Sequence, residues 1–169
     1  MIKLPINLDE LSFVLHRGPE LELACFLDLD TGTIENYPTN REALISLLKL
    51  DDEKGNLYTT EYLVDIMIPK DRNLISIPDK FSEVIYTIMT HFVRKLDGSE
   101  IQLYNELSQI IHQKGDYQLF HEVLQKHPSQ LRRFLETRDT FFERSALNWL
   151  KEHNISVSSA GYSSSNESY

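Results

Sequence analysis

The sequence predicts an α+β protein in which a small N-terminal antiparallel sheet of about four strands packs against a C-terminal helical bundle. Before residue 79, apolar and polar residues alternate in short stretches between turns, a pattern typical of half-buried strands. From Asp79 to about residue 150, apolar residues recur instead at the spacing of one helix face. We therefore expect residues 1–155 to form one α+β domain.

The first predicted strand covers residues 21–29, where every second side chain is apolar. Its apolar side is formed by Leu21, Leu23, Cys25, Leu27 and Leu29. The segment Asp30-Thr31-Gly32-Thr33 has the composition of a tight turn, and residues 33–37 can return as a second strand. The pattern predicts a β-hairpin.

Two more strands are expected after a short helix capped by Asn40 and a polar connection over residues 51–56. Residues 62–68 and 74–77 are rich in β-branched and aromatic residues, and each stretch ends before a proline. The short link between them favours antiparallel pairing.

Everything from Asp79 onward is predicted to be helical. Asp79 can cap a helix that ends at Gly98, and Ser99 with Gln102 forms a capping box for the next helix. Further helices are expected to start at Asp116 and at Pro128.

Arg138 interrupts an apolar stripe if residues 131–149 form one continuous helix. A guanidinium on an apolar face must find a carboxylate or carbonyl partners. Either the helix breaks near Thr137–Thr140, or Arg138 is buried and paired with an acid. We favour a break with structural pairing over an anion-binding role.

The last residues, 156–169, are rich in serine and poor in apolar side chains. Such a segment cannot bury enough apolar surface to offset the entropy lost on ordering. We expect a disordered tail.

Composition excludes several classes of protein. No apolar run approaches the roughly 18 residues of a membrane helix, so we expect no membrane segment. Cys25 is the only cysteine, which favours a reducing, cytoplasmic location. The formal net charge is −9, and residues 1–115 carry 11 Lys and Arg against 19 Asp and Glu, which argues against nucleic-acid binding there.

The most suggestive motif is Asp28-Leu29-Asp30-Thr31-Gly32, which follows an apolar strand. Two acids at this spacing occur in aspartyl phosphatases, but Gly32 stands where that pattern needs Thr or Val. The calcium-loop pattern also fails at Gly32. We interpret Asp30 and Gly32 as turn residues. The alternative is a metal-assisted hydrolase that uses Asp28 and Asp30, with Glu35 or a histidine as a further ligand.

Other fragments of known sites are incomplete. His121-Glu122 begins the helix motif of zinc proteases, but Gln125 replaces its second histidine. Cys25 lies on an apolar strand face without a cationic neighbour in sequence, as expected for a core thiol. The sequence predicts no catalytic residue, no metal ion and no cofactor.

The function favoured by the sequence is a non-catalytic module that binds or regulates another protein. Five residues are candidates for a binding surface: Asp28, Asp30, Arg138, Arg144 and Trp149. A weak nucleic-acid site formed by Arg132, Arg133, Arg138 and Arg144 is a further alternative, although acids are interspersed among these arginines.

Three segments carry a family resemblance. They are residues 26–32, residues 115–124 followed by Pro128, and Arg138-Asp139 with residues 143–150 and Asn154-Ile155. These segments resemble the bacterial uncharacterised protein family 0158. The resemblance implies a bacterial, cytoplasmic protein of this fold class, and it carries over no catalytic residue.

Overall fold

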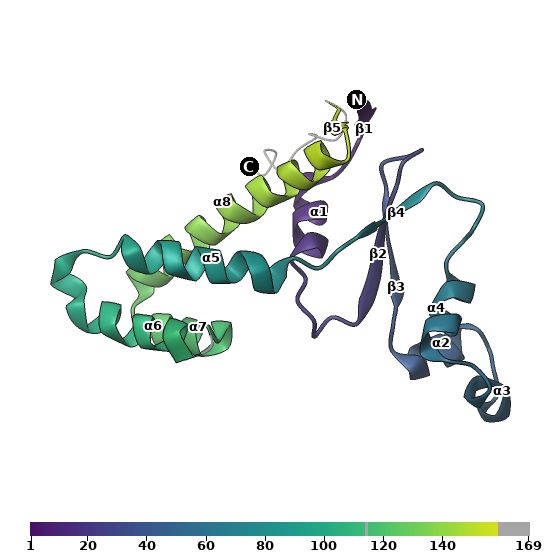
Figure 1. Cartoon of the computed structure of the whole chain (residues 1–169), viewed down its shortest axis with the longest axis horizontal. Coiled ribbons are helices and arrows are strands. Elements are labelled where there is room, and N and C mark those ends of the chain that lie inside the picture. Colours follow the sequence, from purple (N-terminus) through teal and green to yellow (C-terminus); the bar gives the residue numbers. More distant parts are fainter. Residues whose placement is uncertain (114, 159–169) are drawn as a thin grey trace, which may run out of the picture.

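The computed structural model describes residues 1–113 and 115–158. Its elements lie along one long axis, with a helical bundle at one end, a sheet in the middle and three short helices at the other end (Figure 1). The α+β class predicted from the sequence is confirmed.

The central sheet contains three antiparallel strands: β2 (Leu23–Asp28), β3 (Ile34–Pro38) and β4 (Leu74–Ile77). Strand β2 lies in the middle, so that Cys25 pairs with Asn36 on one side and with Ile77 on the other. The predicted hairpin is confirmed. Gly32 in its turn has a φ of +79°, and a Cβ there would lie 3.0 Å from Pro5 Cδ, so this position favours glycine.

The fourth strand predicted for residues 62–68 is wrong, because this segment forms helix α4 (Thr60–Met67). The Thr59 hydroxyl accepts a hydrogen bond from the Tyr62 backbone N–H at 3.2 Å and caps the helix. Leu63 is its fully buried residue, so burial on one helix face outweighs the β-propensity of the segment.

Helix α4 forms a small lobe with α2 (Arg41–Leu47) and α3 (Asp52–Asn56). The side chains of Asn40 and Asp51 cap α2 and α3, as Thr59 caps α4. The predicted cap at Asn40 is thus confirmed, whereas the expected polar connection over residues 51–56 contains a helix. We call residues 41–67 the lobe.

Three elements near the chain ends have no counterpart in the sequence prediction. Strand β1 (Ile2–Leu4) pairs in parallel with β5 (Ile155–Val157), and helix α1 (Leu8–Leu15) follows β1. Ser156 and Val157, which were expected in the disordered tail, therefore belong to a strand. Residues 159–169 of that tail lie outside the described residues.

The bundle consists of α5 (Phe81–Arg94), the short 3-10 helix η1 (Gly98–Glu100), α6 (Ile101–Gln113), α7 (Tyr117–Gln125) and the first part of α8 (Pro128–Glu152). The helix starts predicted at Asp116 and Pro128 are confirmed. Helix α5 ends at Arg94 rather than at Gly98, and Asp97, not Ser99, caps the turn that precedes α6.

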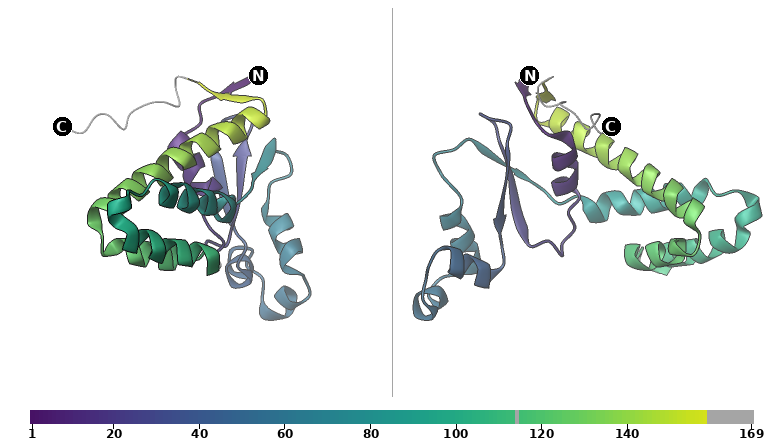
Figure 2. Two further views of the ribbon diagram at one scale, coloured as in Figure 1. Left: turned by 60° about the vertical axis from the view of Figure 1, so that its left-hand side comes forward. Right: turned by 180° about the vertical axis from the view of Figure 1, so that it is seen from behind.

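The predicted break near Thr137–Thr140 is wrong, because α8 is continuous over 25 residues. The Thr137 and Thr140 hydroxyls donate to the Arg133 and Glu136 carbonyls at 2.8 and 3.0 Å, so both threonines remain inside the helix. Helix α8 joins two apolar cores: Phe134 lies in the core of the bundle, and Trp149 lies in a core with α1 and the sheet. The helix runs from the bundle past α1 to the end of the molecule where β1 and β5 lie (Figure 2).

Among the described residues, no helix has both the length and the apolar character needed to cross a membrane.

Candidate functional site

The Asp28 carboxylate is part of the hairpin turn. Only 2% of this residue is exposed, and its Oδ1 accepts hydrogen bonds from the backbone N–H groups of Asp30 at 2.8 Å and Thr31 at 3.2 Å. Its Oδ2 pairs with Arg72. These bonds lower the pKa of Asp28, and the bond from Arg72 has the largest effect. Asp28 therefore stabilises the turn as an anion.

The hydrolase alternative requires acids that converge on a metal ion. Arg72 lies between Asp28 and Glu35 and pairs with both, so a positive charge already occupies the place between these carboxylates. Asp30 is exposed at the turn. Over residues 1–113 and 115–158, no group of three or more His, Cys, Asp or Glu side chains is placed to hold a metal ion. The described side chains therefore offer no metal site on which the hydrolase alternative could be built.

The candidate residues Trp149 and Arg144 differ in burial. Trp149 is 2% exposed and packs in the core with α1 and the sheet, so the expectation that it contributes to a binding surface is wrong. Arg144 is exposed on α8, with its guanidinium 5.7 Å from the centre of the Phe141 ring.

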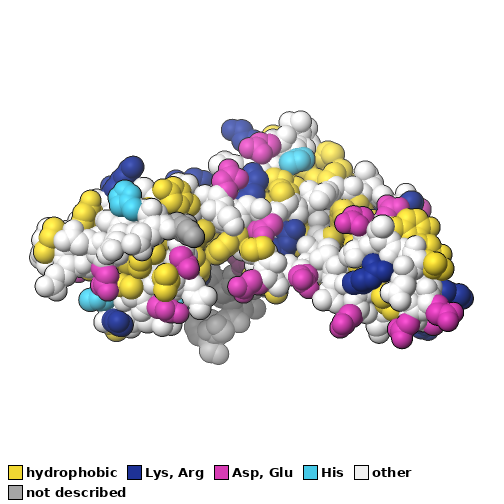
Figure 3. Space-filling model, turned by 60° about the horizontal axis from the view of Figure 1, so that its bottom comes forward, with side chains coloured by type: hydrophobic (Ala, Val, Ile, Leu, Met, Phe, Trp, Pro, Cys, Tyr) yellow, Lys and Arg dark blue, Asp and Glu magenta, His cyan; other side chains and the backbone are white. Residues whose placement is uncertain are grey.

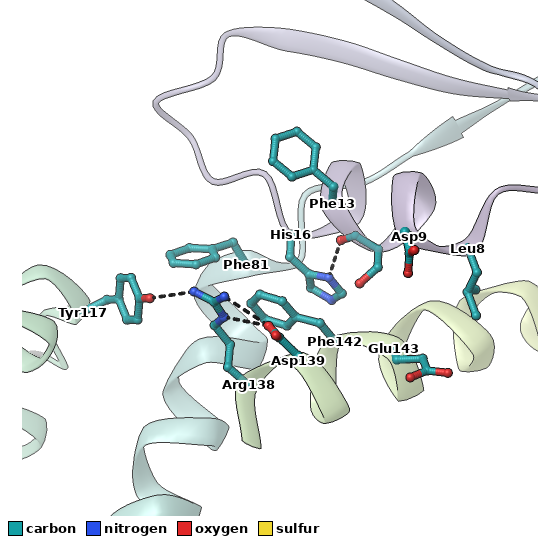
Figure 4. Close-up of a pocket in the computed structure, with 11 residues that line it drawn as sticks. Leu8, Asp9, Phe13, His16, Phe81, Tyr117, Arg138, Asp139, Phe142 and Glu143 are labelled. Atoms are coloured by element: carbon teal, nitrogen blue, oxygen red, sulfur yellow. Dashed lines mark hydrogen bonds and ion pairs between the residues drawn. The ribbon is translucent and has the colours of Figure 1, made fainter. Parts of the chain in front are cut away.

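Arg138 is the candidate residue whose side chain is held in place by several neighbouring side chains. Its Nε and Nη2 donate to Asp139 Oδ1 at 3.2 and 3.0 Å, and its Nη1 donates to the Tyr117 hydroxyl at 3.3 Å. Its guanidinium also lies 5.9 Å from the centre of the Phe142 ring. The expected pairing with an acid is observed without the helix break, but the expected burial is not complete: the side chain of Arg138 is 30% exposed, and its partner Asp139 is exposed (Figure 4).

His16 lies beside this arginine and was not singled out by the sequence analysis. Its ring stacks on Phe142, with centroids 4.1 Å apart and planes 4° from parallel. Its Nδ1 donates to the Ser12 carbonyl at 2.7 Å, because a carbonyl can only accept. Its Nε2 must then accept from the Ser145 hydroxyl at 2.9 Å. Burial lowers the pKa of His16, and the bond to Ser12 opposes this only in part.

These side chains line a hollow of about 490 Å³ between α1, α5, α7 and α8. Four of its lining residues are aromatic: Phe13, Phe81, Tyr117 and Phe142. A second hollow, of about 1000 Å³, also contains Phe81 and Tyr117 in its lining, so the two hollows share this ring pair. We call the two hollows together the aromatic groove.

Among the residues that the structure describes, acidic side chains outnumber lysines and arginines in the lining of the aromatic groove. The acids are Asp9, Asp139 and Glu143 at the first hollow and Glu20, Asp116 and Glu122 at the second. The two arginines, Arg17 and Arg138, both have partners within the chain. Arg17 Nη1 donates to the Val14 carbonyl at 2.7 Å and to the carbonyls of Ile77 and Pro78 at 3.3 Å. The groove therefore presents an acidic rim.

The chain is thus an α+β protein with an aromatic groove between α1, the loop that follows α1, and helices α5, α7 and α8. The chain belongs to the family described as Uncharacterised protein family (UPF0158), which it matches over residues 22–162. The resemblance stated from the sequence is thereby confirmed. Neither the curated proteins nor the solved structures yielded a match to this chain.

One signal in the sequence could have revealed α1, the helix that forms one side of the first hollow. Asn7 followed by apolar residues at positions 11, 14 and 15 is the pattern of a capped amphipathic helix, and it is the helix that carries His16 at its end. The other side could not be found in this way, because the contact between His16 and Ser145 joins residues 129 positions apart.

Proposed function

We propose that this protein is a binding module that holds a basic, partly apolar segment of another protein in the aromatic groove. The observation that carries the proposal is the combination of aromatic side chains in the groove with exposed acids at its rim, of which Asp9, Glu20 and Glu143 have no side-chain partner among the described residues. Neither feature alone would define the ligand, but together they select a chain that carries both apolar and cationic side chains.

The aromatic side chains supply the apolar part of this recognition. Phe13 is 64% exposed and stands at the groove, where a partner side chain could cover it (Figure 4). Phe81 and Tyr117 meet edge to face with centroids 5.4 Å apart, which fixes both rings. Buried aromatic contacts of this kind dominate the energy of many protein interfaces.

The acids supply the electrostatic part. Asp9 on α1 and Glu143 on α8 are exposed at one end of the first hollow, while Arg138 at the other end is occupied by Asp139 and Tyr117 (Figure 4). A lysine or arginine of the partner would find carboxylates here without displacing a bond within the chain. Aromatic faces close by also attract cations.

The groove is preorganised by the bonds within its lining. Both ring nitrogens of His16 have partners, and Arg138 is held from two sides. The side chains of His16 and Arg138 therefore have little conformational freedom to lose when a partner binds, which favours affinity. We place the partner in the bacterial cytoplasm, in accordance with the location that the sequence predicts.

Selection from displayed random peptides of about twelve residues tests this proposal, because such peptides can fill a groove as extended segments. The full chain should enrich peptides with Lys or Arg next to aromatic or aliphatic residues. Binding of an enriched peptide should weaken at higher salt, as expected for contacts between exposed charges.

Two variants in the groove and two control variants on α6 test whether the peptides bind in the aromatic groove. Phe13→Ser and Glu143→Lys change exposed groove residues and should each weaken the enriched peptides, while Ile101→Ser and Glu106→Lys make the same changes on the exposed side of α6 and should not. Enriched peptides that bind all four variants equally, or that carry no excess of basic residues, would refute the proposal.

A further inference from the structure

The lobe buries few apolar side chains for the number that it exposes. Within residues 41–67, only Leu44 and Leu63 are buried large apolar residues. The exposed ones are Leu47, Leu57, Tyr58, Tyr62 and Ile66. Exposed apolar residues that gather in one place mark interaction sites more often than scattered ones do.

Several of these residues lie next to one another. The rings of Tyr58 and Tyr62 stack with centroids 5.0 Å apart. Ile66 follows Tyr62 by four residues on α4, so the two side chains lie on the same side of the helix. Leu57 precedes Tyr58 and is 77% exposed. We call Leu57, Tyr58, Tyr62 and Ile66 the α4 surface.

Acidic residues outnumber basic ones in the lobe that carries the α4 surface. The lobe carries six acids: Glu42, Asp51, Asp52, Glu53, Glu61 and Asp65. It carries three basic residues, of which Arg41 is engaged internally, since its Nη2 donates to the Gly55 and Tyr58 carbonyls at 2.6 and 2.7 Å. Apolar and acidic side chains stand side by side at this end of the molecule (Figure 3, right).

From this pattern we infer that the α4 surface binds a basic amphipathic helix of a partner protein. A partner helix can pack its own row of apolar residues against Tyr62 and Ile66, which are spaced as such rows are. Its basic flanks would meet the acids of the lobe. A second copy of this chain is disfavoured as the occupant, because it would bring two acidic lobes together.

This surface is separate from the aromatic groove. The lobe lies beyond the sheet, at the end of the molecule opposite the bundle, in every view (Figures 1 and 2). The inference therefore does not rest on the function proposed for the groove, and the two can be tested independently.

The test uses two synthetic helical peptides with the same leucine stripe, one flanked by lysines and the other by glutamates. Fluorescence anisotropy with the full chain should show binding of the lysine peptide and none of the glutamate peptide. Leu57→Ser and Tyr62→Ser should each weaken binding about tenfold, the size expected for an interface residue of moderate importance. Because Leu57 is so exposed, its variant keeps the fold.

Two control variants make the result specific. Ile101→Ser removes a comparably exposed apolar side chain from α6 and should not alter binding of the lysine peptide. Phe13→Ser removes any binding of this peptide at the aromatic groove, so Leu57→Ser and Tyr62→Ser are also measured together with Phe13→Ser, where each should again weaken binding about tenfold. The inference is overturned if neither peptide binds, if both bind alike, or if all four variants bind alike. It is also overturned if the wild type self-associates in sedimentation and Tyr62→Ser abolishes this, because the α4 surface would then be a contact between copies.

Discussion

The bundle and the lobe are both helical, but they are held together in different ways. The bundle core contains three buried phenylalanines in mutual contact, Phe92, Phe120 and Phe134, together with seven other buried residues. The lobe has only Leu44 and Leu63 at its centre. The bundle thus has its own continuous core, whereas the lobe lacks one of comparable size.

Polar contacts to the backbone take the place of a larger core in the lobe. Each of its three helices has a side-chain cap, and Arg41 joins α2 to the carbonyls of Gly55 and Tyr58 and to the Thr60 hydroxyl. Such bonds fix the geometry of short helices but add little net free energy each. Because its core is smaller, we expect the lobe to open locally while the bundle stays folded.

The largest effect is expected from Phe134→Ala in the bundle. Phe134 is fully buried between Phe92 and Phe120, so its truncation leaves a cavity that close-packed neighbours cannot fill. The free energy of unfolding should fall by about 3–5 kcal/mol, as measured by urea denaturation. A loss below about 1 kcal/mol would contradict the tight core that distinguishes the bundle from the lobe.

A smaller and local effect is expected from Leu63→Ala in the lobe. This change removes one of two buried apolar side chains and should destabilise the lobe by about 2 kcal/mol, at the low end for such truncations because a small lobe can partly collapse. Hydrogen exchange should accelerate over residues 41–67 and remain unchanged over α5 and α8. Equal acceleration throughout the chain would show that lobe and bundle unfold as one unit.

The same contrast explains how much of the fold the sequence could predict. The starts of α7 and α8 are confirmed because Asp116, Pro128 and the apolar spacing give independent signals, whereas the break predicted within α8 is wrong. In the lobe, the β-branched and aromatic content of residues 62–68 predicts a strand, and this prediction does not take the helix cap at Thr59 into account. Strand β5 was missed because three residues owe their pairing to β1, at the far end of the chain.

The candidate site was less predictable than the fold. Arg138 was recognised as a polar residue on an apolar face, and its pairing with an acid was one of two stated outcomes. The apolar stripe over residues 131–149 includes Trp149 and agrees with its burial, so it is the choice of Trp149 as a binding-surface residue that is wrong. The groove itself depends on α1 and α8 lying side by side, and sequence spacing contains no information on that contact.

An intermediate effect, dependent on pH, is expected at the contact between α1 and α8. His16 is neutral when folded because burial lowers its pKa, whereas the unfolded chain binds a proton below about pH 6.5. The contribution of His16 to stability is therefore fully present above about pH 6.5 and is lost as pH falls toward the lowered pKa of the folded state. For one proton, the slope is at most about 1.4 kcal/mol per pH unit.

Urea denaturation between pH 5 and pH 8 can measure this slope. The groups that act electrostatically on His16 are Asp79 and Lys80, and Arg138 and Asp139 line the same hollow. His16→Gln should flatten the profile relative to wild type, while His112→Gln, on the exposed side of α6, should leave it unchanged. An unaltered profile in His16→Gln would show that the imidazole can take up a proton without loosening the contact.

The smallest effect is expected where the lobe exposes its apolar side chains. Leu57 is 77% exposed, so Leu57→Ser removes little buried surface and should change the free energy of unfolding by no more than about 0.5 kcal/mol. Ile101→Ser in the bundle should behave in the same way, which makes the pair a direct comparison of the two regions. If Leu57→Ser instead costs as much as Leu63→Ala, then Leu57 belongs to the packing of the lobe, and its exposure can no longer be ascribed to a partner.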